Sequence, residues 1–342
     1  MKIRTILAVA LVVVFCFAAA TVFAEKKEVA EGALEETTII LQYQPNPLFA
    51  AMSVALDKGY FEDVGFESVE TKSFTSGNIA GEAMIAGELS VWVPGNMPVI
   101  SMRHAGVPVV ITGMFNVCPA EYLMVRDDAE VEKPEDLKDI KIGLSFGSTA
   151  QGVLEDLARA HGIDPNKLNV VNLPPPEQVT ALRNNETQAL LVWPPNCYKV
   201  QDIASYRFQS KKYSHTNVPM VFAEWQVRKQ PNTCKAIMEA LYRGQEFCAK
   251  KENWEEAQKI HARMSDQPLD IVKQGWADYW NPDIPNGHLD RNFVKDFEAY
   301  TQFQKRVGRI EPPIQHVLEY TYTEFLEEIR PEYAKVEGKW TP

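Results

Sequence analysis

The sequence has few cysteines and histidines, and neither type is spaced to hold a metal ion. Its 342 residues include 5 Cys and 6 His. Zinc sites combine such ligands at short, regular intervals, and no His lies at such an interval from another His or from a Cys. We therefore expect no metal site and no cofactor, with the histidines as surface or packing residues. They are His104, His161, His215, His261, His288 and His316.

The cysteines also offer no obvious disulfide framework. Cys234 and Cys248 fall in one helical pattern, which separates them by roughly 21 Å at about 1.5 Å per residue. A disulfide needs Cα atoms within about 7 Å of each other. A continuous helix would exclude that pair, and we expect mostly free thiols.

Two common patterns, one for phosphate binding and one for catalytic zinc, are missing as well. The chain contains no Gly-x4-Gly-Lys and no His-Glu-x-x-His, the patterns that cradle phosphates and bind catalytic zinc. Basic residues are outnumbered, with 35 Lys and Arg against 46 Asp and Glu and a formal net charge of −11. Such a field repels polyanions, so we expect no nucleic-acid partner. The net charge does not exclude a local anion site built from backbone N–H groups.

Long hydrophobic runs are confined to the N-terminus. Lys2 and Arg4 precede an apolar run at 6–20, and Ala24 supplies a small residue for cleavage. This order is typical of a secretory signal peptide, whereas a spanning helix, the alternative, needs about 20 apolar residues. We expect a signal peptide over residues 1–24, a polar tether over 25–36, and an exported protein.

What the sequence does have, from residue 37 on, is an alternation of short apolar runs and helical patterns. The expected strands are 37–43, 68–74, 89–93 and 107–115, and the expected helices are 48–58, 78–86 and 97–105. A second unit has strands at 141–144, 169–173 and 188–193 and helices at 150–161 and 177–184. This rhythm predicts a largely parallel sheet covered by helices in the first unit, and a second α/β unit after it.

After a strand-like run at 218–227, strand signals vanish. Helical patterns follow at 232–250, 254–264, 269–280, 292–307 and 314–329. A helical tail this long cannot bury its apolar faces alone, so we expect it to pack on the first unit. The second unit then becomes an insertion, with chain crossings near 122–128 and 215–224. Ligands of such sheets bind outside the carboxyl ends of strands, which predicts a site in the cleft between the units.

Four motifs in this chain resemble those of a known family. They are KPEDLKDIKIGLSFGSTA at 133–150, GYFEDVGF at 59–66, EAMIAGEL at 82–89 and LLVWP at 190–194. Together they resemble the periplasmic solute-binding proteins of ABC importers, in the branch for nitrate, alkanesulfonate and taurine, which is related to binders of thiamin-pyrimidine precursors. The family usually has Gly-x-x-Asp-Ala before a strand where this chain has NETQA at 185–189.

The resemblance implies an α/β, type II periplasmic-binding fold with two lobes joined by a double-crossover hinge. Lobe 1 would comprise 37–124 and 220–342, including the helical tail, and lobe 2 would comprise 125–219. The implied function is that of a monomeric, non-enzymatic receptor in the periplasm. It would capture a small anionic organic solute of sulfonate, taurine or nitrate type and deliver it to an ABC permease in the inner membrane. Two alternatives stay open: an enzyme of the same fold, of pyrimidine or menaquinone-precursor type, and a ligand-dependent partner of a membrane sensor.

Gly147, Ser148 and Thr149 are the first candidates for ligand contacts, because they follow a predicted strand and open a predicted helix. The free N–H groups and the positive dipole end of a helix start favour an anion, and the two hydroxyl groups add donors. The resemblance implies that this turn grips the anionic end of the ligand. The alternative is a plain helix cap formed by Ser148.

Polar residues in three other loops are expected to face the same cleft. Gly77 and Asn78 stand before one helix of the first unit, Asn96 before another, and Gln44 and Asn46 after its first strand. Each either meets the ligand or serves turn chemistry.

The remaining candidates lie around aromatic residues. Trp193 and Asn196 end a strand of the second unit, where Trp193 either stacks on a ligand or packs in the core. Phe115 closes a strand of the first unit, and Trp225 follows the second crossing. Both are expected near the cleft, whereas Trp92, between two valines, is expected in the core.

Overall fold

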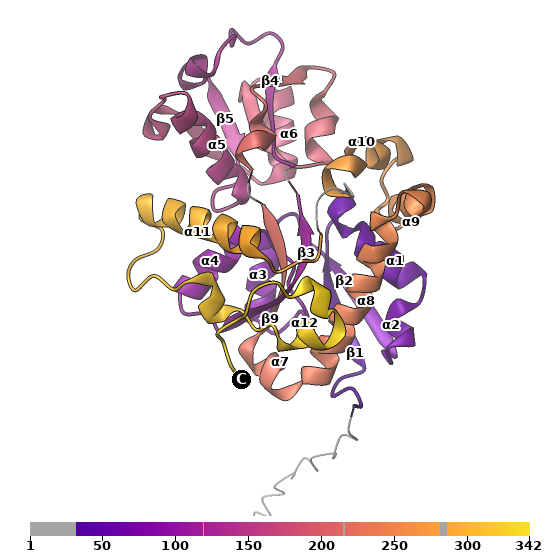
Figure 1. The fold of residues 1–342 in the computed structure, drawn as a ribbon. Helices are drawn as coiled ribbons and strands as arrows, with labels where there is room; N and C mark the ends of the chain where they lie inside the picture. The colour runs from indigo at the N-terminus through magenta and orange to yellow at the C-terminus, as the bar shows by residue number, and fades with distance from the viewer. Residues whose placement is uncertain (1–31, 119, 215, 281–285) are drawn as a thin grey trace, which may run out of the picture.

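The computed structural model describes residues 32–342 apart from 119, 215 and 281–285. It consists of two α/β lobes, one above the other in Figure 1. Lobe 1 comprises 32–117 and 217–342, lobe 2 comprises 122–213, and two short crossings at 118–121 and 214–216 join them. The predicted signal peptide over 1–24 lies outside the described residues, as does the predicted tether up to residue 31.

Lobe 1 contains two two-stranded sheets, one parallel and one antiparallel, so the prediction of a largely parallel sheet is wrong. Strands β1 (Thr38–Tyr43) and β2 (Ser68–Ser73) pair in parallel, whereas β3 (Val109–Val117) and β9 (Asn217–Ala223) are antiparallel. β9 enters lobe 1 from the crossing at 214–216 and runs back along β3, which fixes the antiparallel direction. Such pairing between distant segments leaves no local pattern in the sequence.

The strand expected at 89–93 is reduced to two isolated bridges that link the strand pairs of lobe 1. Val91 bridges Leu41, and Trp92 bridges Val221. Side chains replace part of the backbone ladder here, because Ser90 Oγ accepts from the Ile40 N–H at 3.0 Å and Gln42 Oε1 accepts from the Val93 N–H at 2.9 Å. Trp92 is fully buried, as predicted.

The helices of lobe 1 come from both halves of the chain. The first set is α1 (Ala50–Asp57), α2 (Tyr60–Asp63), α3 (Gly77–Ile85) and α4 (Asn96–His104). The second set is α7 (Glu224–Lys229), α8 (Pro231–Ala249), α9 (Trp254–Ser265), α10 (Leu269–Tyr279), α11 (Arg291–Arg306) and α12 (Glu324–Ile329). The second set packs on the first within one hydrophobic cluster, which confirms the expected position of the helical tail. At Gly244 of α8, an added Cβ would lie 2.1 Å from the Ala51 carbonyl oxygen, so the close packing of α1 and α8 requires glycine there.

Two predictions for the tail are wrong in detail. The strand-like run at 218–227 ends at Ala223, and α7 begins at Glu224. The expected helix over 314–329 is split into a short 3-10 segment, Val317–Tyr320, and α12. Between them Thr321 is extended and bridges Ile111 of β3, so pairing with the sheet overrides the local helical pattern.

Lobe 2 is built around one five-stranded sheet with the order β6-β5-β7-β4-β8. The strands are β4 (Tyr122–Arg126), β5 (Lys141–Leu144), β6 (Asn169–Asn172), β7 (Ala189–Val192) and β8 (Ala204–Tyr206). β6, β5 and β7 are parallel, and β4 is antiparallel to both of its neighbours. Helices α5 (Thr149–Ala160) and α6 (Pro175–Arg183) begin and end within two residues of the predicted positions. Two hydrophobic clusters, separate from that of lobe 1, form its core.

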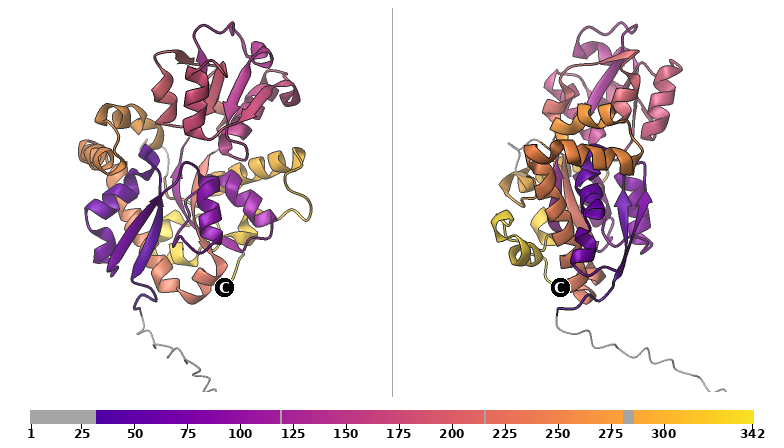
Figure 2. Two further views of the ribbon diagram at one scale, coloured as in Figure 1. Left: turned by 180° about the vertical axis from the view of Figure 1, so that it is seen from behind. Right: turned by 90° about the vertical axis from the view of Figure 1, so that its right-hand side faces the viewer.

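The chain crosses between the lobes earlier than the sequence suggested. β4 already pairs with β7 and β8 of lobe 2, so the first crossing ends at residue 121 rather than within 122–128. The second crossing ends where β9 starts to pair with β3 at Asn217. Helix α10, orange in Figure 2, lies against the base of lobe 2. Gly275 of α10 faces Tyr198 of lobe 2 there, and the side chain of Tyr198 leaves no room for a larger residue.

The end of the expected tether is part of the fold rather than a free linker. Glu35 accepts hydrogen bonds from the backbone N–H groups of Asn232 and Thr233 at 3.2 and 2.8 Å. These groups belong to the first turn of α8, whose free N–H groups need acceptors. Leu34 also packs against the core of lobe 1.

The four cysteines of the described residues are buried and free, as predicted. Cys234 and Cys248 both lie on the continuous helix α8. Over the residues that the structure covers, no helix combines the length and the apolar character needed to cross a bilayer.

Candidate ligand-binding site

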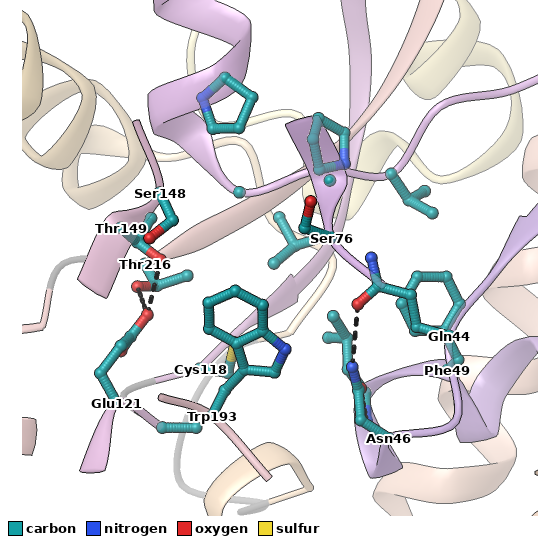
Figure 3. A pocket seen from close by; sticks show the side chains of 18 of the residues that line it. Gln44, Asn46, Phe49, Ser76, Cys118, Glu121, Ser148, Thr149, Trp193 and Thr216 are labelled. Carbon is teal, nitrogen blue, oxygen red and sulfur yellow. Dashed lines mark hydrogen bonds between the residues drawn. The ribbon is translucent and has the colours of Figure 1, made fainter. Parts of the chain in front are cut away.

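A cavity lies between the two lobes, and small-molecule sites commonly lie at such interfaces between domains. Figure 3 shows side chains of both lobes, and of both crossings, around it. Lobe 1 contributes Gln44, Asn46, Leu48, Phe49, Ser76, Gly77, Asn78, Val93, Pro94, Gly95, Pro98, Val218 and Tyr279. Lobe 2 contributes Ser148, Thr149 and Trp193, and the crossings contribute Cys118, Ala120, Glu121 and Thr216.

Three helices begin at the wall of this cavity. α3 starts at Gly77, α4 follows Gly95, and α5 starts at Thr149. Helix starts carry unpaired N–H groups and a partial positive charge. Gly77, Asn78, Ser148 and Thr149 therefore lie where the sequence predicted them.

The hydroxyl groups of Ser148 and Thr149 are already engaged within the protein. Ser148 Oγ donates to the Ser145 carbonyl oxygen at 2.7 Å and makes no helix-capping hydrogen bond through its side chain. Thr149 Oγ1 donates to Glu121 Oε1 at 2.7 Å. The plain N-cap therefore does not describe Ser148, and neither hydroxyl hydrogen points to an empty space.

Glu121 is a cavity residue that the sequence analysis missed. Its side chain is buried, and its carboxylate also accepts from Thr216 Oγ1 at 2.6 Å and Ser214 Oγ at 2.5 Å. Its donors come from α5 and from the second crossing, so no spacing in the sequence links them to Glu121. The only local signal is an acid directly before the crossing predicted near 122–128.

Gln44 and Asn46 form the opposite wall, and Asn46 also serves the turn chemistry expected from the sequence. Asn46 Nδ2 donates to Gln44 Oε1 at 3.2 Å, and Asn46 Oδ1 accepts from the Leu48 N–H at 3.0 Å. Asn46 thus caps the 3-10 turn Pro47–Phe49 and lines the cavity at the same time (Figure 3).

Trp193 projects into the cavity between Glu121 and Gln44 (Figure 3). It is half-buried at the end of β7 and also lines a neighbouring groove of about 1170 Å³. Asn196 lines that groove, together with Lys199, rather than the cavity itself. Gln44 and Asn46 are shared by both spaces, so the indole forms part of the wall between them.

Besides Asn196, four other predicted residues do not line the cavity. Asn96 is fully buried in the first turn of α4, and Phe115 packs behind Phe49 with ring centroids 5.8 Å apart. The N–H of Gly147 donates to Gln151 Oε1 at 3.1 Å. Trp225 is exposed on α7.

The placement of Trp225 corrects the prediction most clearly. β9 leads from the second crossing to the far end of lobe 1, where Ala223 pairs with Val109 at the start of β3. α7 therefore lies at the bottom of Figure 1, away from lobe 2. Glu224, beside Trp225, pairs with Arg103 at 2.6 Å and Arg228 at 2.9 Å, so its carboxylate is engaged within lobe 1.

The two lobes touch around the rim of the cavity. Asn78 Nδ2 donates to the Phe146 carbonyl oxygen at 3.3 Å, and Arg309 Nη2 donates to Gln151 Oε1 at 2.7 Å. An added Cβ on Gly95 would lie 3.1 Å from the Thr149 methyl group. These contacts define a conformation in which the lobes touch where α5 begins.

The thiol of Cys118 in the cavity wall is not set up as a nucleophile. Burial raises its pKa well above the ordinary value of a thiol, and Glu121 and Asp278 raise it further. The thiolate is the reactive form of cysteine, so this environment disfavours it. In the described part of the chain, no group of His, Cys, Asp and Glu side chains could hold a metal ion.

Ser145 stands in a Gly-x-Ser-x-Gly run at 143–147, the pattern around the nucleophile of α/β-hydrolases. Its hydroxyl donates to the Leu173 carbonyl oxygen at 3.0 Å and lies 3.3 Å from Gln178 Nε2. Neither partner is a base, and Ser145 does not line the cavity. The motif serves packing of the loop after β5 rather than acyl transfer.

Comparisons with known proteins agree with this geometry. The pattern of the family described as NMT1/THI5 like matches residues 46–253. A taurine-binding periplasmic protein of Escherichia coli is 23% identical over 308 residues, which cover 86% of this chain and 94% of that protein. Two solved structures share the fold. The alkanesulfonate-binding protein SsuA from Xanthomonas axonopodis has a TM-score of 0.74 at 17% identity, covering 85% of this chain and 100% of the other. The periplasmic nitrate-binding protein NrtA from Synechocystis has a TM-score of 0.71 at 16% identity, covering 88% and 90%.

Proposed function

The chain belongs to the NMT1/THI5-like family, and on that premise we propose that it is the solute-binding component of an ABC importer. In this proposal it is exported to the periplasm, captures a small anionic organic solute of sulfonate, taurine or nitrate type, and delivers it to a membrane permease. The observation that carries the proposal is the cavity between the lobes, whose wall is built by both lobes and by the two crossings that join them.

Capture would proceed by a hinge motion at the crossings. Residues 118–121 and 214–216 are the covalent connections between the lobes, and they are short. Thr149 and Trp193 approach Gly95 and Gln44 only while the lobes are together, so a ligand that touches both walls binds the closed form more tightly. Such differential affinity is what shifts a conformational equilibrium. The permease would then distinguish the closed receptor from the open one.

A binding role, rather than catalysis, fits the groups in the cavity. Ser148 and Thr149 donate to protein oxygens, and the Cys118 thiol is held protonated by burial. The wall offers amides, hydroxyl groups and one indole, which orient a ligand without an activated nucleophile.

The proposal is tested by thermal unfolding of the protein against taurine, isethionate, nitrate and several alkanesulfonates. A ligand at about 100 times its dissociation constant stabilises by about 2.7 kcal/mol, a shift of several degrees. We expect at least one hit, weakened by Trp193→Ala and unchanged by Trp225→Ala, which replaces a Trp outside the cavity. The bound solute should be recovered chemically unchanged. Conversion of the solute, or no shift with any of them, would contradict the receptor.

A further inference from the structure

Glu121 gives the cavity a negative charge that no lining residue described by the structure balances. The lining residues within the described part of the chain include no Lys, Arg or His. None of the ion pairs among the described residues involves Glu121 either. Its exposed fraction is 3%, and a buried charge without a counter-charge is costly.

The hydrogen bonds of Glu121 orient its carboxylate without neutralising it. Oε1 accepts from Thr149 and Thr216, and Oε2 accepts from Ser214. A carboxylate offers about four acceptor positions. These three donors occupy three of them, so one position on Oε2 remains free for a ligand. Neutral hydroxyl groups cannot supply the missing positive charge.

The same carboxylate occupies the place predicted for an anionic ligand. Thr149 is the first residue of α5, and the start of a helix favours a negative charge. Glu121 provides that charge from within the protein. The anionic end of a solute would be repelled here, and must face the starts of α3 and α4 instead.

We propose that the solute presents a positively charged nitrogen to Glu121, which makes Glu121 the specificity-determining residue of the cavity. The site then selects amine-bearing organic solutes over nitrate and over sulfonates without an amine. The indole of Trp193, which projects into the cavity beside Glu121 (Figure 3), favours the same charge because its ring face attracts cations. This inference rests on the proposed receptor function and narrows its substrate class.

Matched ligand pairs test the inference on the unaltered protein. Taurine and isethionate differ by an ammonium against a hydroxyl group, and 3-aminopropanesulfonate and propanesulfonate differ by an ammonium against a hydrogen. We expect calorimetry to show at least tenfold tighter binding of the amine in a pair. Equal or tighter binding of the amine-free partner, or binding of nitrate without binding of either pair, would overturn the inference and leave the receptor intact. Binding of none of these solutes would contradict both.

A variant locates the effect at Glu121. Glu121→Gln keeps the shape of the side chain and removes its charge, so affinity for the amine should fall at least tenfold while affinity for the amine-free partner holds or rises. Glu155→Gln is the matched control, because Glu155 is a half-buried carboxylate of α5 that lies outside the cavity. An unchanged amine affinity in a folded Glu121→Gln protein, with folding checked by circular dichroism, would also overturn the inference.

Discussion

The ammonium group of Lys211 lies 2.7 Å from a carboxylate oxygen of Asp278, joining lobe 2 to helix α10 of lobe 1. The Tyr122 hydroxyl donates to the other oxygen of Asp278, and the Lys211 ammonium lies 4.6 Å from the centre of the Tyr122 ring. The side chains of Lys211 and Asp278 are 30% and 18% exposed. This group of side chains links the lobes on the side of α10.

Asp278→Asn should weaken that link. It leaves a partly buried ammonium without its counter-charge, so we expect the free energy of unfolding to fall by about 1–2 kcal/mol. The radius of gyration of the ligand-free protein, measured by small-angle X-ray scattering, should rise as the lobes separate. Glu256→Gln, which breaks the more exposed Lys58 pair within lobe 1, should change neither quantity much. Equal effects of the two variants would show that the Lys211 pair has no special role.

Gly152→Ala should hold the lobes apart at the opposite side. An added Cβ would lie 2.4 Å from the ring of Tyr300 on α11, closer than packed atoms allow. We expect about a tenfold loss of affinity for the solute, or roughly 1.4 kcal/mol, because the closed form must distort. Gly143→Ala is the control, since its added Cβ would come no closer than 3.4 Å to any neighbour. Isothermal calorimetry measures the affinity of both variants for the solute. Wild-type affinity in Gly152→Ala would show that ligand binding does not need the close approach of Gly152 to Tyr300.

Stability should fall as the pH falls below 6.5, because His261 is buried in its neutral form. Burial lowers the pKa of His261 from 6.5 to about 3, and its Nδ1 lies 2.9 Å from Ser53 Oγ in the core of lobe 1. Between pH 3 and pH 6.5 the unfolded chain binds a proton at His261 that the folded chain does not bind. The free energy of unfolding should therefore fall by about 1.4 kcal/mol for each pH unit below 6.5.

The slope from His261 can be separated from that of the carboxylates by a substitution. His261→Gln should unfold with a shallower dependence between pH 6.5 and pH 4, whatever its stability at neutral pH. Urea unfolding at several pH values measures the difference between the two proteins. Parallel curves would mean that His261 has an ordinary pKa in the folded state.

Glu35→Ala should destabilise lobe 1, because it removes the acceptor for two N–H groups at the start of α8. Loss of such a cap costs about 1 kcal/mol. Glu36→Ala is the neighbouring control, since Glu36 contacts α8 through its backbone N–H, which donates to Thr233 Oγ1. Chemical denaturation compares them, and an equal effect of the two substitutions would contradict the capping role.

The sequence predicted elements well where their signals are local. β5 was expected over the residues that it occupies, and α5 was displaced by one residue at each end. Structural features that depend on partners distant in the sequence were not predicted. The direction of β9 is set by pairing with β3, about a hundred residues earlier, and Thr321 leaves its helical pattern to bridge Ile111.

The same distinction applies to the cavity. Gly77, Asn78, Ser148 and Thr149 were found because a glycine or serine before a helix is a local pattern. Glu121 was not, because its partners Thr149 and Thr216 reach it only after both crossings are made. Trp225 was misplaced because the length of β9, which carries it to the far end of lobe 1, could not be judged without knowing its partner.

The insertion of lobe 2 within lobe 1 also affects the order in which the protein can fold during synthesis. Lobe 2 is one continuous stretch from 122 to 213, whereas β3 finds its sheet partners only at Asn217 and Thr321. Contacts between distant residues form slowly, and apolar surface awaiting them is prone to aggregate. The lobe that is made second on the ribosome can therefore be finished first. Residues 32–117 can complete their packing only after 217–342 have been made.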